Sequence, residues 1–128
     1  MKLSSLATAG LTTSILSILA GAIVRATGSG DGCGASWPTC NGRVIPSLET
    51  SSEIIEFSHR SISGVLLIVT LLLFVKSKDP DTPLLHKKII NYLTFFVLLE
   101  AAIGAVIVIY EWVGLNSSLP RIIAVPLH

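Results

Sequence analysis

The chain has 128 residues, of which 51% are hydrophobic and 13% are charged, and its formal net charge is +1. A typical soluble domain is about 25% charged, so this composition excludes a basic nucleic-acid-binding protein, an acidic tail and a disordered regulator. The mean hydropathy of +0.75 indicates a membrane protein instead.

Three segments are long and apolar enough to predict membrane-spanning helices, since a span needs about 20 mostly apolar residues. We expect these spans at 3–24, 55–75 and 89–113, and we expect 121–128 to be the start of a fourth. The predicted fold class is an all-α membrane protein, a single domain that forms half of a four-helix transmembrane bundle. In this half the fourth helix is largely missing.

Basic residues in the loops predict the orientation of the spans. The loop between the second and third spans contains four lysines, whereas the longer loop at 25–53 contains only Arg25 and Arg43. Short loops rich in Lys and Arg stay in the cytoplasm. We therefore expect a multi-pass protein of the prokaryotic cell membrane, with a cytoplasmic N-terminus and with the loop at 25–53 outside.

The first predicted span has a face of small residues, Gly10, Ser14, Ser17 and Gly21. They recur at helical spacing, and small residues let helix backbones approach closely in lipid. This face is expected to be a packing surface.

Both cysteines, Cys33 and Cys40, lie in the predicted outer loop. Oxidising conditions on that side favour a disulfide. Such a bond could simply rigidify the loop, or it could be a redox-active pair that passes electrons. A zinc site is disfavoured, because two cysteines without a nearby histidine are an incomplete ligand set.

Ionisable residues lie at the start of the second span and in the middle of the third. Glu56, His59 and Arg60 are spaced to share one helix face. They form either a functional cluster or a cap in which Glu56 pairs with Arg60. Glu100 lies within the third span, where a carboxylate should be protonated or paired; a hydrogen bond across the bundle and a proton relay both remain open.

Two of the three histidines are candidate ligands. Counted at the helical rise per residue, His59 lies about 5 Å and His128 about 9 Å below the same surface. Two imidazoles from different helices at similar depth could bind one haem iron from opposite faces. His86 lies beside two lysines of the cytoplasmic loop and is assigned no role.

A set of motifs resembles the haem A synthase (CtaA/Cox15) family, from about Val24 to the end of the chain. In this sequence the motifs are Val24-Arg25-x-Thr27-Gly28-Ser29-Gly30-x-x-Cys33, Trp37-Pro38-x-Cys40-x-Gly42, Ile45-Pro46 and Glu56-x-x-His59-Arg60. Any one of them would be a weak signal, whereas their combination and order are specific.

The resemblance implies an enzyme that oxidises the C8 methyl group of haem O to a formyl group, giving haem A for terminal oxidases. The family consists of two similar four-helix halves, each with a histidine pair, and it uses haem b as cofactor. The implied roles are axial iron ligation by His59 and His128, haem binding by Arg60, and acid–base catalysis by Glu56. Cys33 and Cys40 would be the outer-loop pair.

Three departures from the family pattern stand out. Asn41 occupies a position where histidine is common, and Glu100 one where an amide is frequent. Only one half is present, so we expect either a truncated form or a half-size, archaeal-type form that pairs with a second copy.

The expected partners are membrane lipid, haem O, a second copy and an assembly with haem O synthase or a terminal oxidase, with no nucleic acid. Two other functions remain open. One is a non-catalytic haem-binding or electron-transfer subunit, and the other is a membrane thiol–quinone oxidoreductase that uses Cys33 and Cys40.

Overall fold

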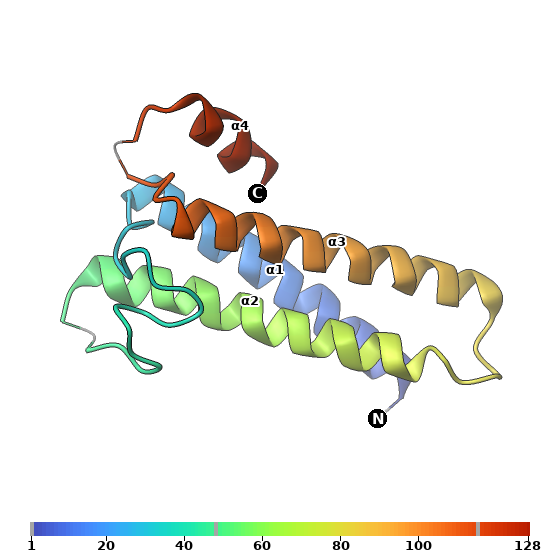
Figure 1. Cartoon of the computed structure of the whole chain (residues 1–128). Helices are drawn as coiled ribbons and strands as arrows, with labels where there is room; N and C mark the ends of the chain where they lie inside the picture. The colour runs from blue at the N-terminus through green and yellow to red at the C-terminus, as the bar shows by residue number, and fades with distance from the viewer. Residues whose placement is uncertain (1, 48, 115) are drawn as a thin grey trace.

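The computed structural model describes residues 2–47, 49–114 and 116–128. Three long helices, α1 (Leu3–Thr27), α2 (Ser51–Lys76) and α3 (Leu84–Ile109), lie lengthwise beside one another (Figure 1). The short helix α4 (Leu119–Leu127) turns back alongside the carboxyl-terminal half of α3. The predicted all-α fold is confirmed.

The three long helices have the dimensions of membrane spans. They contain 25 or 26 residues each and are apolar enough to cross a membrane. At a rise of about 1.5 Å per residue, each is longer than the hydrocarbon core of about 30 Å. The three predicted spans are therefore confirmed as candidate membrane helices, whereas α4 has nine residues.

The first two helices extend beyond the predicted spans because of their capping residues. The helix α1 continues past residue 24 to Thr27, where Gly28 adopts the left-handed conformation (φ 66°) and ends it. The helix α2 begins four residues before the predicted position. There the side-chain oxygen of Thr50 accepts a hydrogen bond from the backbone N–H of Glu53 at 3.2 Å.

The third helix is shifted toward the amino terminus relative to its prediction at 89–113. It begins directly after Pro83 and ends at Ile109. Glu111 and Gly114 both have positive φ angles, 53° and 57°, which no right-handed helix can contain. These two residues turn the chain so that α4 can return along α3.

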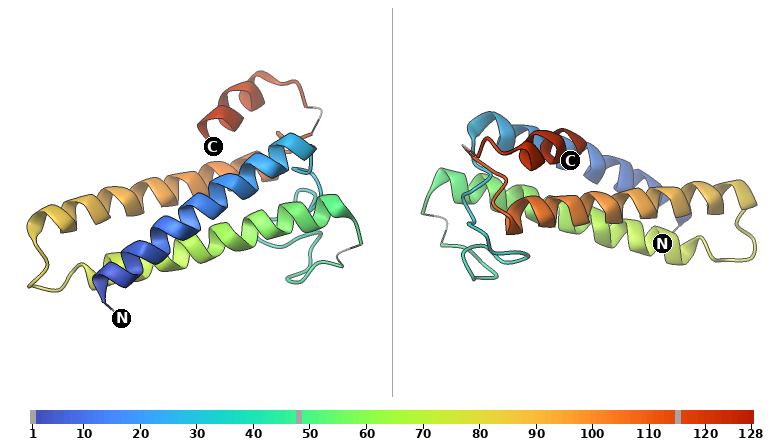
Figure 2. Two further views of the ribbon diagram at one scale, coloured as in Figure 1. Left: turned by 180° about the vertical axis from the view of Figure 1, so that it is seen from behind. Right: turned by 45° about the horizontal axis from the view of Figure 1, so that its top comes forward.

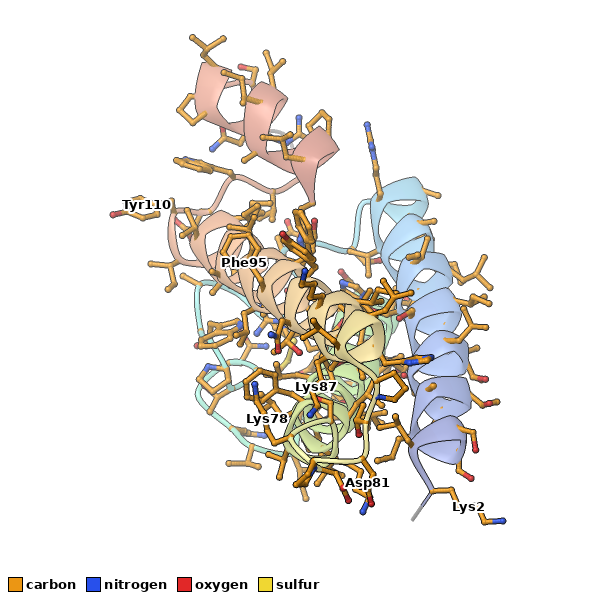
Figure 3. All side chains as sticks on the ribbon, turned by 90° about the vertical axis from the view of Figure 1, so that its right-hand side faces the viewer. Lys2, Lys78, Asp81, Lys87, Phe95 and Tyr110 are labelled. Atoms are coloured by element: carbon orange, nitrogen blue, oxygen red, sulfur yellow. A yellow bond between two sulfur atoms is a disulfide. The ribbon has the colours of Figure 1, made fainter. Side chains whose placement is uncertain are left out.

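The connections gather at two opposite ends of the molecule (Figure 2). The N-terminus and the α2–α3 turn share one end, while the loop with the two cysteines and the α3–α4 connection share the other. Figure 3 looks onto the first end and labels Lys2, Lys78, Asp81 and Lys87 of its terminus and turn. The N-terminus and the lysine-rich turn therefore lie at the same end, as the predicted topology requires. Which end faces the cytoplasm stays a prediction.

The small-residue face of α1 packs against α2, as predicted. The hydroxyl oxygens of Ser17 and Ser63 are 2.7 Å apart across the two helices. A Cβ atom added at Gly10 would lie 3.8 Å from a methyl group of Val69, at ordinary contact distance. Many large apolar side chains are left facing outward, for example Ile18 at 71% exposure. Lipid-facing helices expose such residues.

Candidate functional site

The two cysteines of the outer loop form a disulfide bond in the structure. Both side chains are completely buried. Backbone hydrogen bonds between Cys40 and Arg43, at 2.8 and 2.9 Å, close a tight turn beside the bond. The disulfide predicted between Cys33 and Cys40 is therefore confirmed as a staple of the loop, and its redox role stays a prediction.

Glu56 ties this loop to α2. One carboxylate oxygen accepts a hydrogen bond from the backbone N–H of Cys33 at 2.8 Å, and the other forms an ion pair with Arg60. Only 3% of Glu56 is exposed. The predicted pairing of Glu56 with Arg60 is present, and it is extended by a contact to the disulfide ring.

Arg60 holds the same loop from the other side. Its guanidinium donates hydrogen bonds to the backbone carbonyls of Ser36 at 2.6 Å and Thr39 at 2.7 Å. Both carbonyls lie between the two cysteines. The observed contacts of Arg60 are thus with the loop, and its predicted role in haem binding stays a prediction.

Glu53 is a third member of this cluster and is absent from the predicted site residues. Its carboxylate accepts hydrogen bonds from the Asn41 amide at 3.3 Å and the Ser47 hydroxyl at 3.0 Å, and it lies 3.9 Å from Sγ of Cys40. The spacing Thr50-x-x-Glu53 is that of a capping box and could have drawn attention to it. We call Glu53, Glu56 and Arg60 the loop anchor.

Gly32 allows the loop to sit against the start of α2. A Cβ atom at this position would lie 2.5 Å from the backbone carbonyl of Ser52, which is a severe clash. Asn41, which stands in place of the histidine common in the family, has a positive φ of 51°. Asparagine tolerates that conformation. Its side-chain amide nitrogen also donates a hydrogen bond to the backbone carbonyl of Gly32 at 3.1 Å.

His59 and His128 lie close together. Their ring centroids are 6.2 Å apart and the ring planes are inclined by 72°. His59 comes from α2 and His128 follows α4. We call these two residues the imidazole pair. Within the described residues, no hydrogen bond or ion pair joins Glu56 to His59, so the three ionisable residues at the start of α2 belong to two separate clusters.

A glycine on a neighbouring helix faces each imidazole. A Cβ atom at Gly21 in α1 would lie 3.1 Å from Cε1 of His59, and one at Gly104 in α3 would lie 2.8 Å from Cε1 of His128. The two glycines therefore make room for the two rings. Gly21 was expected only to pack helices, and Gly104 was not singled out by the sequence.

Glu100 contacts one of the imidazoles. Its carboxylate oxygen Oε2 lies 3.1 Å from Nδ1 of His128. The side chains of Glu100 and His128 are 48% and 32% exposed. Glu100 is thus paired with a side chain from another part of the chain, and its role in a proton relay stays a prediction.

The imidazole pair fits a haem iron in spacing. Two metal–nitrogen bonds of about 2 Å and a distance of about 1 Å from each nitrogen to its ring centre add up to about 6 Å between centroids. Nδ1 of His59 is buried and, among the described residues, has no hydrogen-bond partner. Those residues contain no group of three or more His, Cys, Asp or Glu side chains able to hold a metal ion. Two imidazoles suffice only where a porphyrin supplies the remaining ligands.

Comparisons with known proteins agree with the motifs. Residues 4–54 match the COX15-CtaA family, described as cytochrome oxidase assembly protein. The haem A synthase of Lysinibacillus sphaericus is 41% identical over 97 residues, which cover 75% of this chain and 32% of that protein. The haem A synthase of Staphylococcus epidermidis is 40% identical over 94 residues, covering 73% of this chain and 31% of that protein.

A relative with a different name matches nearly the whole chain. The protoheme IX farnesyltransferase of Thermus thermophilus is 39% identical over 130 residues, which cover 99% of this chain and 21% of that protein. The chain thus spans between about a fifth and a third of the length of these relatives. No solved structure matches it significantly. Residues 4–54 thus match the COX15-CtaA family, and the chain is homologous to haem A synthases over about three quarters of its length.

Proposed function

We propose that this chain forms one haem-binding half of a haem A synthase, which oxidises the C8 methyl group of haem O to a formyl group. His59 and His128 would hold haem b. The observation that carries the proposal is the centroid separation of 6.2 Å between two imidazoles from different helices. Homology to haem A synthases supports the reaction.

The similarity to a protoheme IX farnesyltransferase supports a farnesylated haem as the substrate. That relative is named for adding a farnesyl group to protohaem, and haem O carries such a group. A substrate with a long apolar tail suits a site whose helices expose apolar side chains to lipid.

The residues of the chain would supply position and proton handling. Turning the methyl group and one water molecule into a formyl group releases four electrons and four protons, and bound haem would pass the electrons to an electron acceptor. Glu56 lies one helical turn from His59, and its carboxylate is held by the backbone N–H of Cys33 and the guanidinium of Arg60. A carboxyl group held near the haem would take up protons released as the methyl group is oxidised.

The proposal includes the surroundings of the site. The loop with the disulfide would face the outside of the cell membrane and the lysine-rich turn would face the cytoplasm. We propose that a second copy of the chain is one of its partners. Haem O synthase and a terminal oxidase are the proposed neighbours in the membrane.

The test is to express the full chain in membranes, supply haem and record the absorption spectrum of the purified protein. We expect a low-spin spectrum that is lost in His59→Ala and in His128→Ala but kept in the control His86→Ala. Incubation with haem O should then give haem A, detected by mass. A chain that stays colourless overturns the proposal, and haem binding without formyl product favours a non-catalytic haem-binding subunit.

A further inference from the structure

We propose that Glu100 is a positioning residue for His128, which fixes the ring of this ligand and strengthens its bond to iron. This inference rests on the proposed role of His128 as an iron ligand. The family pattern does not supply it, because an amide is frequent where this chain has Glu100.

The first step of the argument is the contact itself. Oε2 of Glu100 lies 3.1 Å from Nδ1 of His128. An ionised carboxylate at this distance favours a proton on Nδ1 of the imidazole. The other nitrogen, Nε2, then has a free lone pair, which is the form of histidine that binds metals.

The second step is the position of Glu100 in its helix. It is the only acidic residue of α3 and lies within an otherwise apolar span. A carboxylate in such a place is costly unless it is paired, and its partner here is His128. The pairing therefore offsets the cost of Glu100 and holds the imidazole at the same time.

The third step is the way in which α3 holds the ring at two points. Glu100 and Gly104 are four residues apart and so lie on one face of the helix. The ring edge of His128 lies over Gly104, where a Cβ would approach it to 2.8 Å. Gly104 sets how close the ring lies to α3, and the contact with Glu100 sets its rotation.

The fourth step is the difference between the two histidines. Nδ1 of His59 has no hydrogen-bond partner in the part of the chain that the structure describes, whereas Nδ1 of His128 has a carboxylate. A carboxylate on the far nitrogen makes an imidazole a stronger electron donor. His128 is thus the stronger ligand of the pair, and it favours ferric over ferrous iron.

The test uses two substitutions in the full chain loaded with haem b. Glu100→Gln keeps a hydrogen-bond acceptor but removes the charge, and Glu100→Leu removes both. We expect the reduction potential of the haem to rise in both variants, and the electron paramagnetic resonance spectrum of the ferric haem to change. Haem affinity should fall by about 10-fold to 100-fold in Glu100→Leu and less in Glu100→Gln.

The matched control is Glu111→Gln, which removes an exposed carboxylate just beyond α3. It should leave the potential, the spectrum and the affinity unchanged. If Glu100→Gln and Glu100→Leu both keep the wild-type potential and affinity, or if Glu111→Gln shifts them equally, the role of Glu100 is overturned while the haem site stands.

A measurement without haem separates this inference from the proposed function. Nitrogen-15 resonances of His128 in the detergent-solubilised chain should show the proton on Nδ1 in the wild type and a mixture of both tautomers in Glu100→Leu. Failure of the wild type to bind haem would overturn the proposed function, and the tautomer would still decide whether Glu100 orients His128. The same tautomer mixture in both proteins would overturn the positioning role.

Discussion

The loop anchor and the imidazole pair share the first turns of α2 but differ in how completely their polar atoms are used. In the loop anchor, Glu53 and Glu56 are 4% and 3% exposed, and each carboxylate oxygen has a partner. In the imidazole pair, one ring nitrogen of His59 is buried without a partner and His128 is 32% exposed.

This difference separates a cluster whose polar atoms are paired within the chain from one that has room for an added ligand. A buried polar group without a partner costs free energy, so a folded protein satisfies such groups unless a ligand is to complete them. The loop anchor is complete within the chain. The imidazole pair has the spacing of a site that an added group completes, and one of its ring nitrogens has no partner among the described residues.

The strongest test of this difference between the two clusters is to remove the arginine of the loop anchor. Arg60→Met leaves the buried carboxylate of Glu56 without its counter-ion, and losing one partner of a buried pair costs about 3 to 5 kcal/mol. We expect this loss in denaturant unfolding of the detergent-solubilised protein.

The control for this prediction is Arg43→Met, because Arg43 is an exposed residue of the same loop. It should change the free energy of unfolding little. Equal destabilisation by both variants would mean that the loop anchor has no special part in stability.

Removing the disulfide should have the next largest effect. The double variant Cys33→Ser, Cys40→Ser frees a ring of eight residues, and the chain-entropy relation gives a loss of about 2.5 kcal/mol. Unfolding under non-reducing conditions measures it. If haem A formation stops while the loop still resists proteolysis, the cysteines have the redox role instead of the structural one.

Filling the space beside each ring should perturb the imidazole pair. Gly104→Ala places a methyl group 2.8 Å from the ring of His128, so the ring must shift. Overpacking of this kind costs about 1 to 3 kcal/mol, and we expect haem affinity to fall about tenfold or more in a titration. Gly21→Ala, at 3.1 Å from His59, should have a smaller effect.

Gly64→Ala is the matched control for these two variants. Gly64 also lies in a long helix, but a Cβ there would meet no atom within 4 Å. Alanine should stabilise the helix by about 1 kcal/mol and leave haem affinity unchanged. A loss of affinity in Gly64→Ala would show that the effect at Gly104 is not local.

The smallest expected effect concerns the contact between α1 and α2. The Ser17–Ser63 hydrogen bond joins α1 to α2 at 2.7 Å. Hydrogen bonds between helices in membrane proteins contribute about 0.6 kcal/mol on average. A double-mutant cycle with Ser17→Ala and Ser63→Ala, measured by unfolding, should give a coupling energy of that size. Zero coupling would mean that the bond does not stabilise the contact between α1 and α2.

Much of the fold could be predicted because span length and loop charge are properties of the sequence alone. The helix ends depend on local caps instead. Thr50 and Gly28 extend helices past the apolar runs from which the spans were predicted. Such caps add only a few polar residues to each span, which the hydropathy of a run does not register.

The site could be predicted less completely because its contacts depend on tertiary structure. The pairing of Glu56 with Arg60 follows from a spacing of four residues. The contact between Glu100 and His128 requires α4 to return along α3, and that return depends on the positive φ angles of Glu111 and Gly114. The four-residue spacing of Glu100 and Gly104 is a signal in the sequence that could have placed both residues on one helix face.

The glycines opposite the two imidazoles have a consequence for recognising this arrangement elsewhere. Gly21 and Gly104 precede their histidines by 38 and by 24 residues, and each belongs to a different helix from its histidine. A related sequence that keeps both glycines retains the room for two aromatic ligands. A sequence with bulkier residues there has lost that room, even if both histidines remain. The residues at these two glycine positions therefore distinguish, from sequence alone, chains with room for two ligand rings from chains without it.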